Sequence, residues 1–204
     1  SLVTDRNQDQ YAVFYAGSLA AEARPDGQKI NDTLSALLVS PEDPDRFAFM
    51  VSAAQKNNVP YYCDPGQIIT VLPAEFLADA LEKSAGLFCN TYELDLIAQK
   101  LGISSEKVVQ KSPLSVITNG EHGTTLYTKD GRQNFSAIPA QTVRNVTGCG
   151  DAFRAGFLGG ISKKLPLETA VNLGTLIATS VVESDRPQIA DFSYISQMKN
   201  PAGG

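Results

Sequence analysis

The sequence predicts an α/β protein in which helices flank a mostly parallel β-sheet. Between residues 34 and 118, short apolar runs that suit buried strands alternate with longer segments of helical pattern. Repeated strand–helix units of this size are typical of a parallel sheet with helices on both faces. Residues 127–138 predict an antiparallel hairpin at the sheet edge, because Asp130-Gly131 is a favoured two-residue turn signal.

The composition is that of an ordinary soluble globular protein. The chain has 204 residues, 43% hydrophobic and 19% charged, and we expect one domain over residues 1–204. A formal charge of -5 argues against a nucleic-acid or anionic-membrane surface, although a local site can still bind a nucleotide. The widely spaced Cys63, Cys89 and Cys149 indicate neither a zinc site nor a disulfide framework. Their odd number, with no signal peptide and no long apolar run, predicts a cytoplasmic protein.

Turn and capping signals predict the individual elements. We expect a hairpin over residues 1–16, with strands at Leu2–Thr4 and Gln10–Ala16, and a buried strand at Leu34–Val39. Ser40 is then a candidate N-cap with Pro41 at the first helical position, so a helix should run to about Asn57. The further elements expected are a strand at Val59–Cys63, a turn at Asp64–Gly66, a helix at Ala74–Ala85 ended by Gly86, a strand at Leu87–Cys89, a helix at Thr91–Leu101 ended by Gly102, a short helix after Ser104, strands at Leu114–Thr118 and Thr124–Tyr127, and a helix from about Leu165 to Val182.

Residues 145–157 combine a small-residue turn with the start of a helix, and the rest of the chain is organised around them. Thr147 to Gly150 form the turn, and a tightly packed helix is expected from Ala152 onward. Glycines let a ligand approach the main chain, and the first N–H groups of a helix favour an anion, most often a phosphate. Asp151 lies at the helix start, where a carboxylate can take a hydroxyl proton while the N–H groups hold a moving phosphate. The alternative is a helix cap with glycines for packing.

This stretch resembles the C-terminal signature of the ribokinase-like (pfkB) carbohydrate and nucleoside kinases. Its Gly-Cys-Gly-Asp-Ala-Phe-Arg-Ala-Gly run looks most like the adenosine-kinase-like branch, although the family's usual leading Asp is Asn145 here. The resemblance implies a ribokinase-like three-layer sandwich with Asp151 as the catalytic base. It also implies an anion hole at Gly148, Cys149 and Gly150, with Thr147 among the nucleotide-binding residues.

Three further positions are candidates with open alternatives. Arg154 lies one turn after Asp151 on roughly the same helix face, so it is a candidate phosphate contact. A plain ion pair with Asp151 or Glu93 is an equal alternative. In the family the helix near residues 165–182 flanks the adenine pocket, which makes Asn172 and Gly174 candidates, against a close-packed core helix as the alternative.

Asn90-Thr91-Tyr92-Glu93 follows the third strand of the parallel series. An Asn N-cap with Glu three residues later is close to a capping box. The run is also similar to the family's Asn-x-x-Glu motif, which helps hold magnesium and the phosphates, largely through water. Since Mg²⁺ keeps several waters and uses few carboxylates, Asn90 and Glu93 are chemically sufficient.

Thr118-Asn119-Gly120-Glu121-His122-Gly123 ends the next strand and looks like the family's Thr-x-Gly-x-x-Gly turn, over which the nucleotide phosphates lie. Gly120 and Gly123 allow close approach, and the Thr118 hydroxyl can donate to a phosphate oxygen. A glycine-rich connection between two strands is the alternative. His122, the only histidine, is expected to be a turn residue rather than a base or ligand.

The order of the three motifs implies ATP-dependent phosphorylation of a primary hydroxyl. The acceptor is a nucleoside such as adenosine, with a simple sugar as the runner-up. ATP and Mg²⁺ are the implied cofactors, whereas a monovalent cation and a homodimer are left open. A nucleotide-binding module without turnover is the alternative from a different class.

The start of the chain differs from the family pattern. Residues 4–10 followed by Phe14–Ser18 are similar to a segment that follows the substrate-binding lid in the same branch. The family's first strand, substrate-binding Asp, Gly-Gly pair and most of the lid precede that point and are not found here. We therefore expect a fragment, a truncated relative, or a chain whose missing part lies elsewhere.

Overall fold

The computed structural model describes residues 2–4, 10–12, 30–31 and 33–186. The chain divides into two compact units, residues 1–136 and 137–204. The strands of the described residues belong to the first unit, and the second unit contains a pair of helices. The expectation of one domain over residues 1–204 stays a prediction.

The predicted hairpin at the start of the chain is confirmed in its described residues. β1 (Leu2–Thr4) pairs antiparallel with β2 (Gln10–Ala12), so that Leu2 lies opposite Ala12. The predicted turn at residues 5–9, the rest of the second strand and the segment Phe14–Ser18 lie outside the described residues.

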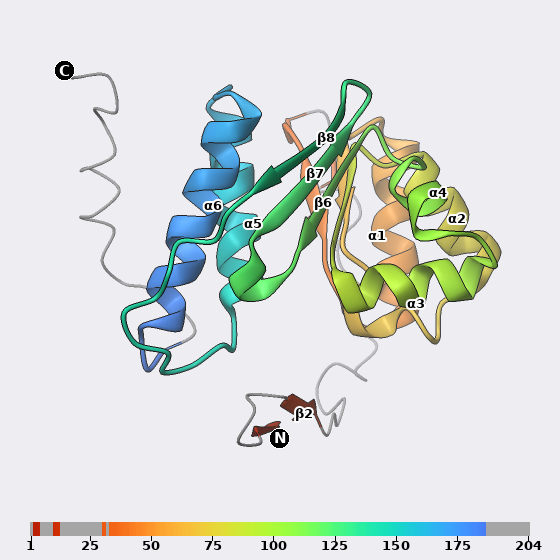
Figure 1. The fold of residues 1–204 in the computed structure, drawn as a ribbon. Coiled ribbons are helices and arrows are strands. Elements are labelled where there is room, and N and C mark those ends of the chain that lie inside the picture. The colour runs from red at the N-terminus through yellow and green to blue at the C-terminus, as the bar shows by residue number, and fades with distance from the viewer. Residues whose placement is uncertain (1, 5–9, 13–29, 32, 187–204) are drawn as a thin grey trace. The chain divides into compact units, whose positions relative to one another are not determined.

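A six-stranded sheet is the framework of the first unit (Figure 1). Its strands are β3 (Leu37–Val39), β4 (Tyr61–Cys63), β5 (Gly86–Asn90), β6 (Leu114–Thr118), β7 (Thr124–Thr128) and β8 (Gly131–Phe135), and they lie side by side in chain order. β3 to β6 pair in parallel, whereas β7 pairs antiparallel with both β6 and β8. The predicted mostly parallel sheet with an antiparallel edge is confirmed.

Four helices of the first unit lie on one side of the strands in Figure 1. They are α1 (Pro44–Lys56), α2 (Ala74–Glu82), α3 (Thr91–Leu101) and α4 (Ser105–Val109). Their apolar faces and the sheet form one hydrophobic core, which includes Phe47 and Val51 of α1, Leu77 and Leu81 of α2, Ile97 of α3, Val108 of α4, and Leu87, Cys89 and Ile117 of the strands. Burial of such side chains is the main force that holds the helices on the sheet.

α1 begins three residues later than predicted, at Pro44 rather than Pro41. Its N-cap is Asp43, whose Oδ1 accepts a hydrogen bond from the Asp45 N–H at 3.0 Å. A helix begun at Pro41 would place Pro44 at the fourth position, where the backbone N–H must reach a carbonyl and proline has none. The predicted end near Asn57 is confirmed, because Asn57 is the C-cap.

Gly86 opens β5 instead of ending α2, which already stops at Glu82. A β-carbon at Gly86 would lie 3.0 Å from the Leu114 carbonyl oxygen and 3.0 Å from Cδ1 of Tyr62. The prediction that Gly86 ends the helix was therefore wrong. A side chain at this position would collide with the two neighbouring strands, which is why the residue is a glycine.

The other boundaries of the first unit are close to the predicted ones. α3 and β6 have the predicted limits, and Gly102 ends α3 in the left-handed conformation with φ 64°. Ser104 precedes α4 as predicted. β3 and β4 are shorter than expected and begin at Leu37 and Tyr61.

The described residues of the second unit form α5 (Cys149–Ser162) and α6 (Leu167–Val182) with the segments beside them. A β-carbon on Gly156 would lie 2.8 Å from the Gly174 α-carbon, and one on Gly160 would lie 2.9 Å from the Ala170 α-carbon. The two helices therefore pack antiparallel, with backbones in close contact. The sequence predicted that this helix starts at Ala152. α5 begins three residues earlier, because Gly148 supplies a left-handed N-cap.

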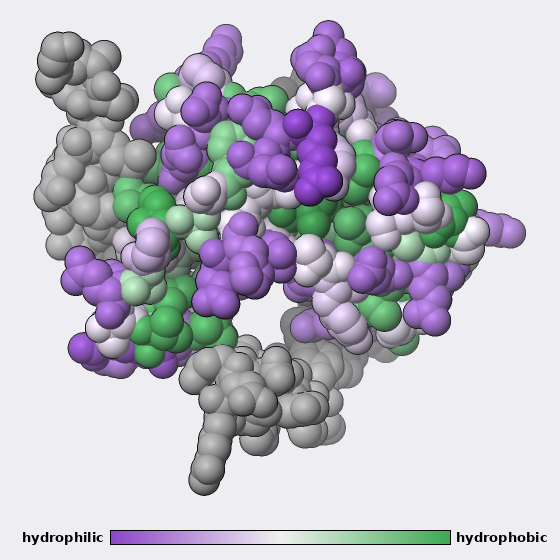
Figure 2. Space-filling view, in the orientation of Figure 1, coloured by the Kyte–Doolittle hydropathy of each residue, from purple (hydrophilic) through white to green (hydrophobic). Residues whose placement is uncertain are grey.

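The surface in Figure 2 carries hydrophilic side chains throughout, with hydrophobic ones between them in smaller groups. Exposed large hydrophobic residues such as Val71, Tyr92 and Val143 are far apart in the sequence. Among the described residues, no helix has both the length and the apolar character needed to cross a membrane.

Candidate functional site

The first group of predicted site residues lies at the carboxyl edge of the parallel strands. β5 ends at Asn90 and β6 at Thr118, and these two residues are direct partners in the β5–β6 register. Thr118 also pairs with Thr124 at the start of β7. The sheet order therefore brings the Asn-x-x-Glu and Thr-x-Gly-x-x-Gly motifs together at one edge, where ligands of open α/β sheets gather.

Asn90 and Glu93 form a complete capping box at the start of α3. The Asn90 Oδ1 accepts from the Glu93 N–H at 2.8 Å, and the Glu93 Oε2 accepts from the Asn90 N–H at 2.8 Å. The structural alternative predicted for this motif is thus present. Each side chain keeps further lone pairs, because a carboxylate accepts at two oxygens and an amide oxygen accepts twice.

The turn after β6 is built on two glycines with positive φ, 51° at Gly120 and 95° at Gly123. The short 3-10 helix η4 (Gly120–His122) closes it, and the Asn119 N–H donates to the Gly123 carbonyl at 2.8 Å. The Thr91 hydroxyl donates to the Asn119 Oδ1 at 3.4 Å and so links this turn to α3. His122 is exposed and belongs to the turn, as predicted.

Sequence reasoning missed a buried carboxylate at the same edge. Asp64 follows β4 directly, is only 1% exposed, and donates its backbone N–H to the Val39 carbonyl at 2.9 Å. Its sequence context, Asp-Pro-Gly after a strand, was interpreted only as a turn. The signal that could have found it is an acidic residue at the carboxyl end of a strand next to β5.

The second group of site residues surrounds the first turn of α5. Gly148 has φ 83° and caps the helix without a side chain. Before it, the Asn145 Oδ1 accepts from the Thr147 N–H at 2.8 Å. The first intrahelical bond of this turn joins the Ala152 N–H to the Gly148 carbonyl at 2.9 Å. Of the three N–H groups between them, that of Cys149 donates to the Val146 carbonyl at 3.4 Å. The first N–H groups of a helix have no partner in the helix itself, which is the arrangement that favours an anion.

Asp151 lies in this first turn and is paired with Arg154. The Arg154 Nη2 and the Asp151 Oδ1 are 2.7 Å apart, and the side chains are 18% and 77% exposed respectively. Of the predicted alternatives for Arg154, the ion pair with Asp151 is the one present. The Asp151 carboxylate is therefore accessible from solvent.

Cys149 occupies the first helical position, half-buried in the turn. Burial raises the pKa of the Cys149 thiol above its usual value. The thiol therefore stays protonated near neutral pH and adds no negative charge next to the N–H groups.

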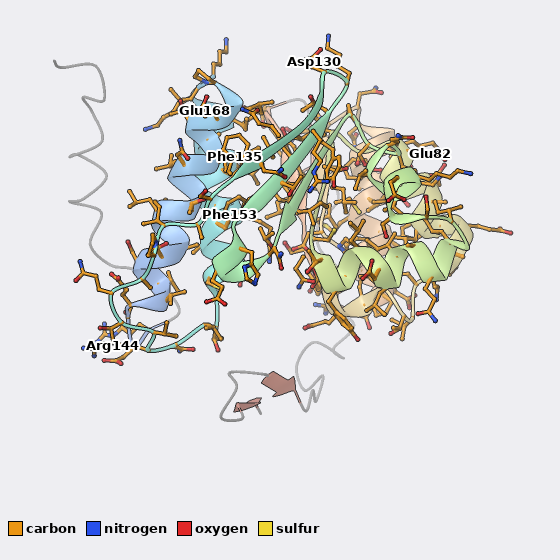
Figure 3. All side chains as sticks on the ribbon, in the orientation of Figure 1. Glu82, Asp130, Phe135, Arg144, Phe153 and Glu168 are labelled. Carbon is orange, nitrogen blue, oxygen red and sulfur yellow. The ribbon has the colours of Figure 1, made fainter. Side chains whose placement is uncertain are left out.

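The two α6 candidates differ in their surroundings. Asn172 is exposed, whereas Gly174 is buried, and a β-carbon there would lie 2.7 Å from the Phe153 carbonyl oxygen. Phe153 lies on α5 (Figure 3), so close helix packing accounts for this glycine. The packing alternative for Gly174 is thus present, and the adenine-pocket role of both residues stays a prediction.

The metal-binding role of Asn90 and Glu93 stays a prediction. No group of three or more His, Cys, Asp and Glu side chains that could hold a metal occurs in the described part of the chain. A pair of oxygen donors suits Mg²⁺, which keeps most of its water ligands.

The sequence matches a family model. Residues 3–191 match the model described as pfkB family carbohydrate kinase. The match covers both predicted groups of site residues and most of the chain.

Two relatives of the chain are kinases, and the chain matches only part of the length of each. The chain is 28% identical over 183 residues to a nucleoside kinase of Methanocaldococcus jannaschii, which covers 90% of this chain and 60% of that protein. It is 25% identical over 159 residues to an adenosine kinase of Saccharomyces cerevisiae, which covers 71% of this chain and 47% of that protein. The chain thus spans about half to three-fifths of the length of these relatives.

Solved structures confirm the predicted ribokinase-like fold class. A nucleoside kinase from Burkholderia thailandensis, solved in complex with inosine, has a TM-score of 0.80 at 28% identity and covers 92% of this chain and 61% of that one. A ribokinase from Thermotoga maritima has a TM-score of 0.78 at 20% identity, with 98% and 68% covered, and shows likeness of fold alone.

Proposed function

The chain belongs to the pfkB family of carbohydrate kinases, and on that basis we propose that it transfers phosphate from ATP to a primary hydroxyl of a nucleoside. The observation that carries this proposal is the first turn of α5. A left-handed Gly148, the N–H groups of a helix start and an accessible Asp151 carboxylate lie together there. This combination suits phosphoryl transfer, where catalysis depends on positioning and on stabilising charge.

In the proposed reaction Asp151 is the general base. It takes the proton of the acceptor hydroxyl while the N–H groups of Gly148, Cys149 and Gly150 stabilise charge on the transferring phosphoryl group. Because the Cys149 thiol is neutral, it adds no negative charge next to the transferring phosphoryl group. Thr147 donates to the same group of phosphate oxygens.

The carboxyl edge of the sheet is assigned to the nucleotide. Thr118, Gly120 and Gly123 hold the phosphates, because glycines with positive φ shape the turn and have no side chain to keep a ligand from the backbone. Asn90 and Glu93 hold Mg²⁺ through water. The ion supplies charge neutralisation at the phosphates when it is bound. Asn172 and Gly174 are assigned to the surroundings of the adenine.

An adenosine-like nucleoside is the proposed acceptor. The relatives named above are a nucleoside kinase and an adenosine kinase, and the Burkholderia thailandensis nucleoside kinase was solved with inosine. A sugar such as ribose or fructose is the second candidate, because the matched family is described as carbohydrate kinases. The cytoplasmic location stays a prediction, and a homodimer stays open.

The test is ADP release from ATP and Mg²⁺ with adenosine, other nucleosides, ribose and fructose, each run with Asp151→Asn. Proton transfer by a positioned base contributes about 10²- to 10⁴-fold, so the variant should lose activity on that scale with an unchanged fold. Glu168→Gln is the matched control, since Glu168 is an exposed acid in the first turn of α6. It lies at the opposite end of α6 from Arg144 in Figure 3.

Acceptor-dependent turnover that disappears only in Asp151→Asn supports the kinase and names its substrate class. Binding of ATP without turnover on any acceptor supports the nucleotide-binding module instead. Absence of both binding and turnover would overturn the proposal.

A further inference from the structure

The guanidinium group of Arg154 lies over the turn that begins α5. A β-carbon built on Gly150 would be 3.4 Å from its Nη1, 3.7 Å from its Nη2 and 3.8 Å from its Cζ. Since Cα–Cβ bonds of a helix tilt toward its N-terminus, this position is on the N-terminal side of the first turn. A full positive charge therefore adds to the partial positive charge of the helix start.

The same guanidinium holds the proposed base. Its Nη2 is 2.7 Å from the Asp151 Oδ1, and the two side chains differ sharply in exposure, 18% for Arg154 against 77% for Asp151. The cation is held by its surroundings, whereas the carboxylate can turn into water at small cost. An ion pair whose carboxylate is this exposed contributes about 0–1 kcal/mol, so a stronger anion can displace the carboxylate.

We propose that Arg154 is a positioning residue with two partners: it pairs with Asp151 while the turn is empty and moves to a phosphate oxygen when a phosphate occupies the turn. Arg binds phosphate in a bidentate and charge-assisted way, and phosphate carries more charge than a carboxylate. Occupation of the turn thereby releases Asp151 to take a proton. This inference rests on the proposed function, because it requires that the turn binds phosphate.

The proposal makes the Arg154–Asp151 pair and phosphate binding compete, and competing equilibria are coupled. Removing the carboxylate with Asp151→Asn should tighten binding of ATP–Mg²⁺ when Arg154 is present, because the carboxylate then no longer competes with phosphate for the guanidinium. Where Arg154 is replaced by Gln, only the general repulsion between Asp151 and phosphate is removed. The tightening should therefore be about three- to tenfold larger with Arg154 than without it.

The experiment is a double-mutant cycle on ATP–Mg²⁺ binding, measured calorimetrically for the wild-type chain, D151N, R154Q and the double variant. Arg154→Lys adds a second variant that keeps the charge without the bidentate geometry, and its coupling should lie between those of Arg and Gln. Arg144→Gln with Asp185→Asn is the control, since this exposed pair of the same unit has a similar separation of 3.0 Å. That control cycle should leave nucleotide affinity unchanged.

The proposal is overturned if D151N tightens ATP binding equally with and without Arg154. If the wild-type chain also phosphorylates an acceptor, that result leaves the proposed function standing. Loss of ATP binding in every protein of the cycle, wild type included, would overturn both.

Discussion

The Asn145 Oδ1 accepts a hydrogen bond from the Thr147 N–H at 2.8 Å, which closes a turn directly before the left-handed Gly148. The backbone N–H groups of Arg144 and Asn145 both donate to the Val182 carbonyl at the end of α6, at 2.9 and 3.2 Å. The segment is thus anchored before the turn begins. The Asn145 amide supplies the acceptor that a carboxylate would supply at this position.

We expect Asn145→Ala to lower the free energy of unfolding by about 1 kcal/mol, because the Thr147 N–H loses its acceptor. Asn145→Asp should cost clearly less, since a carboxylate oxygen accepts in the same way. Thermal unfolding of both variants checks this, with Asn172→Ala, an exposed amide on α6, as the control. Equal losses for Ala and Asp at residue 145 would contradict the prediction.

Substitution of Glu93 separates its two roles. Glu93→Gln keeps an oxygen that can accept from the Asn90 N–H, so stability should change by less than about 0.5 kcal/mol, while the charge offered to Mg²⁺ is lost. Glu93→Ala should lose both, including about 1 kcal/mol of stability. The Mg²⁺ concentration that half-saturates turnover, measured beside thermal unfolding, should rise in both variants.

Glu75→Gln controls for the loss of an acid in the first turn of a helix, because Glu75 is an exposed acid in the first turn of α2. A Glu93→Gln variant with normal Mg²⁺ dependence would show that Glu93 serves the capping box alone.

The candidate site residues could be predicted from motifs, but which of them are neighbours could be known only from the order of the strands in the sheet. Asn90 and Thr118 are 28 positions apart, and only the pairing of β5 with β6 makes them partners. The rule that ligands gather at the carboxyl ends of parallel strands predicted this edge without the pairing. Asp64 was missed because a buried carboxylate and an exposed turn residue look alike in an Asp-Pro-Gly run.

Gly174 tests packing against ligand binding. A methyl group there would lie 2.7 Å from the Phe153 carbonyl oxygen, so Gly174→Ala should destabilise the protein by about 1–3 kcal/mol through forced separation of α5 and α6. Gly159→Ala is the matched control, since nothing lies within 4 Å of its added methyl group. It should instead stabilise α5 by about 0.5–1 kcal/mol. Chemical denaturation checks both, and a neutral Gly174→Ala would contradict the packing role.

The sequence could predict a boundary where its cause is local, and could not where the cause is a contact with a distant residue. Gly102 ends α3 as expected, because a left-handed C-terminal glycine is a local feature of the helix. Gly86 was misinterpreted because its cause lies in Tyr62 and Leu114, which are distant in the sequence. For α1 the local signal was sufficient but was placed at Pro41, although Pro44 would then occupy the fourth helical position, where its missing N–H is needed.

Tyr61 gives a prediction for the pH dependence of stability. Its hydroxyl donates to the Ala80 carbonyl at 2.7 Å and accepts from the Gln55 Nε2 at 3.1 Å, and burial raises the Tyr61 pKa from 10.0 to about 12. The unfolded chain therefore ionises at this residue first. The stability that Tyr61 contributes is complete below pH 10, and it falls as the pH rises toward about 12.

Tyr61→Phe should cost about 1 kcal/mol near neutral pH, because the Ala80 carbonyl loses its donor. Between pH 10 and about 12 the wild type should lose on the order of 2 kcal/mol more than the variant, so that the difference shrinks and then reverses. Tyr62, whose pKa burial also raises, is retained in both proteins and cancels. Denaturant unfolding at several pH values checks this, with Tyr92→Phe at the exposed start of α3 as the control. A wild-type and Tyr61→Phe difference that is constant across this range would mean that the phenol ionises as readily in the folded protein as in the unfolded chain.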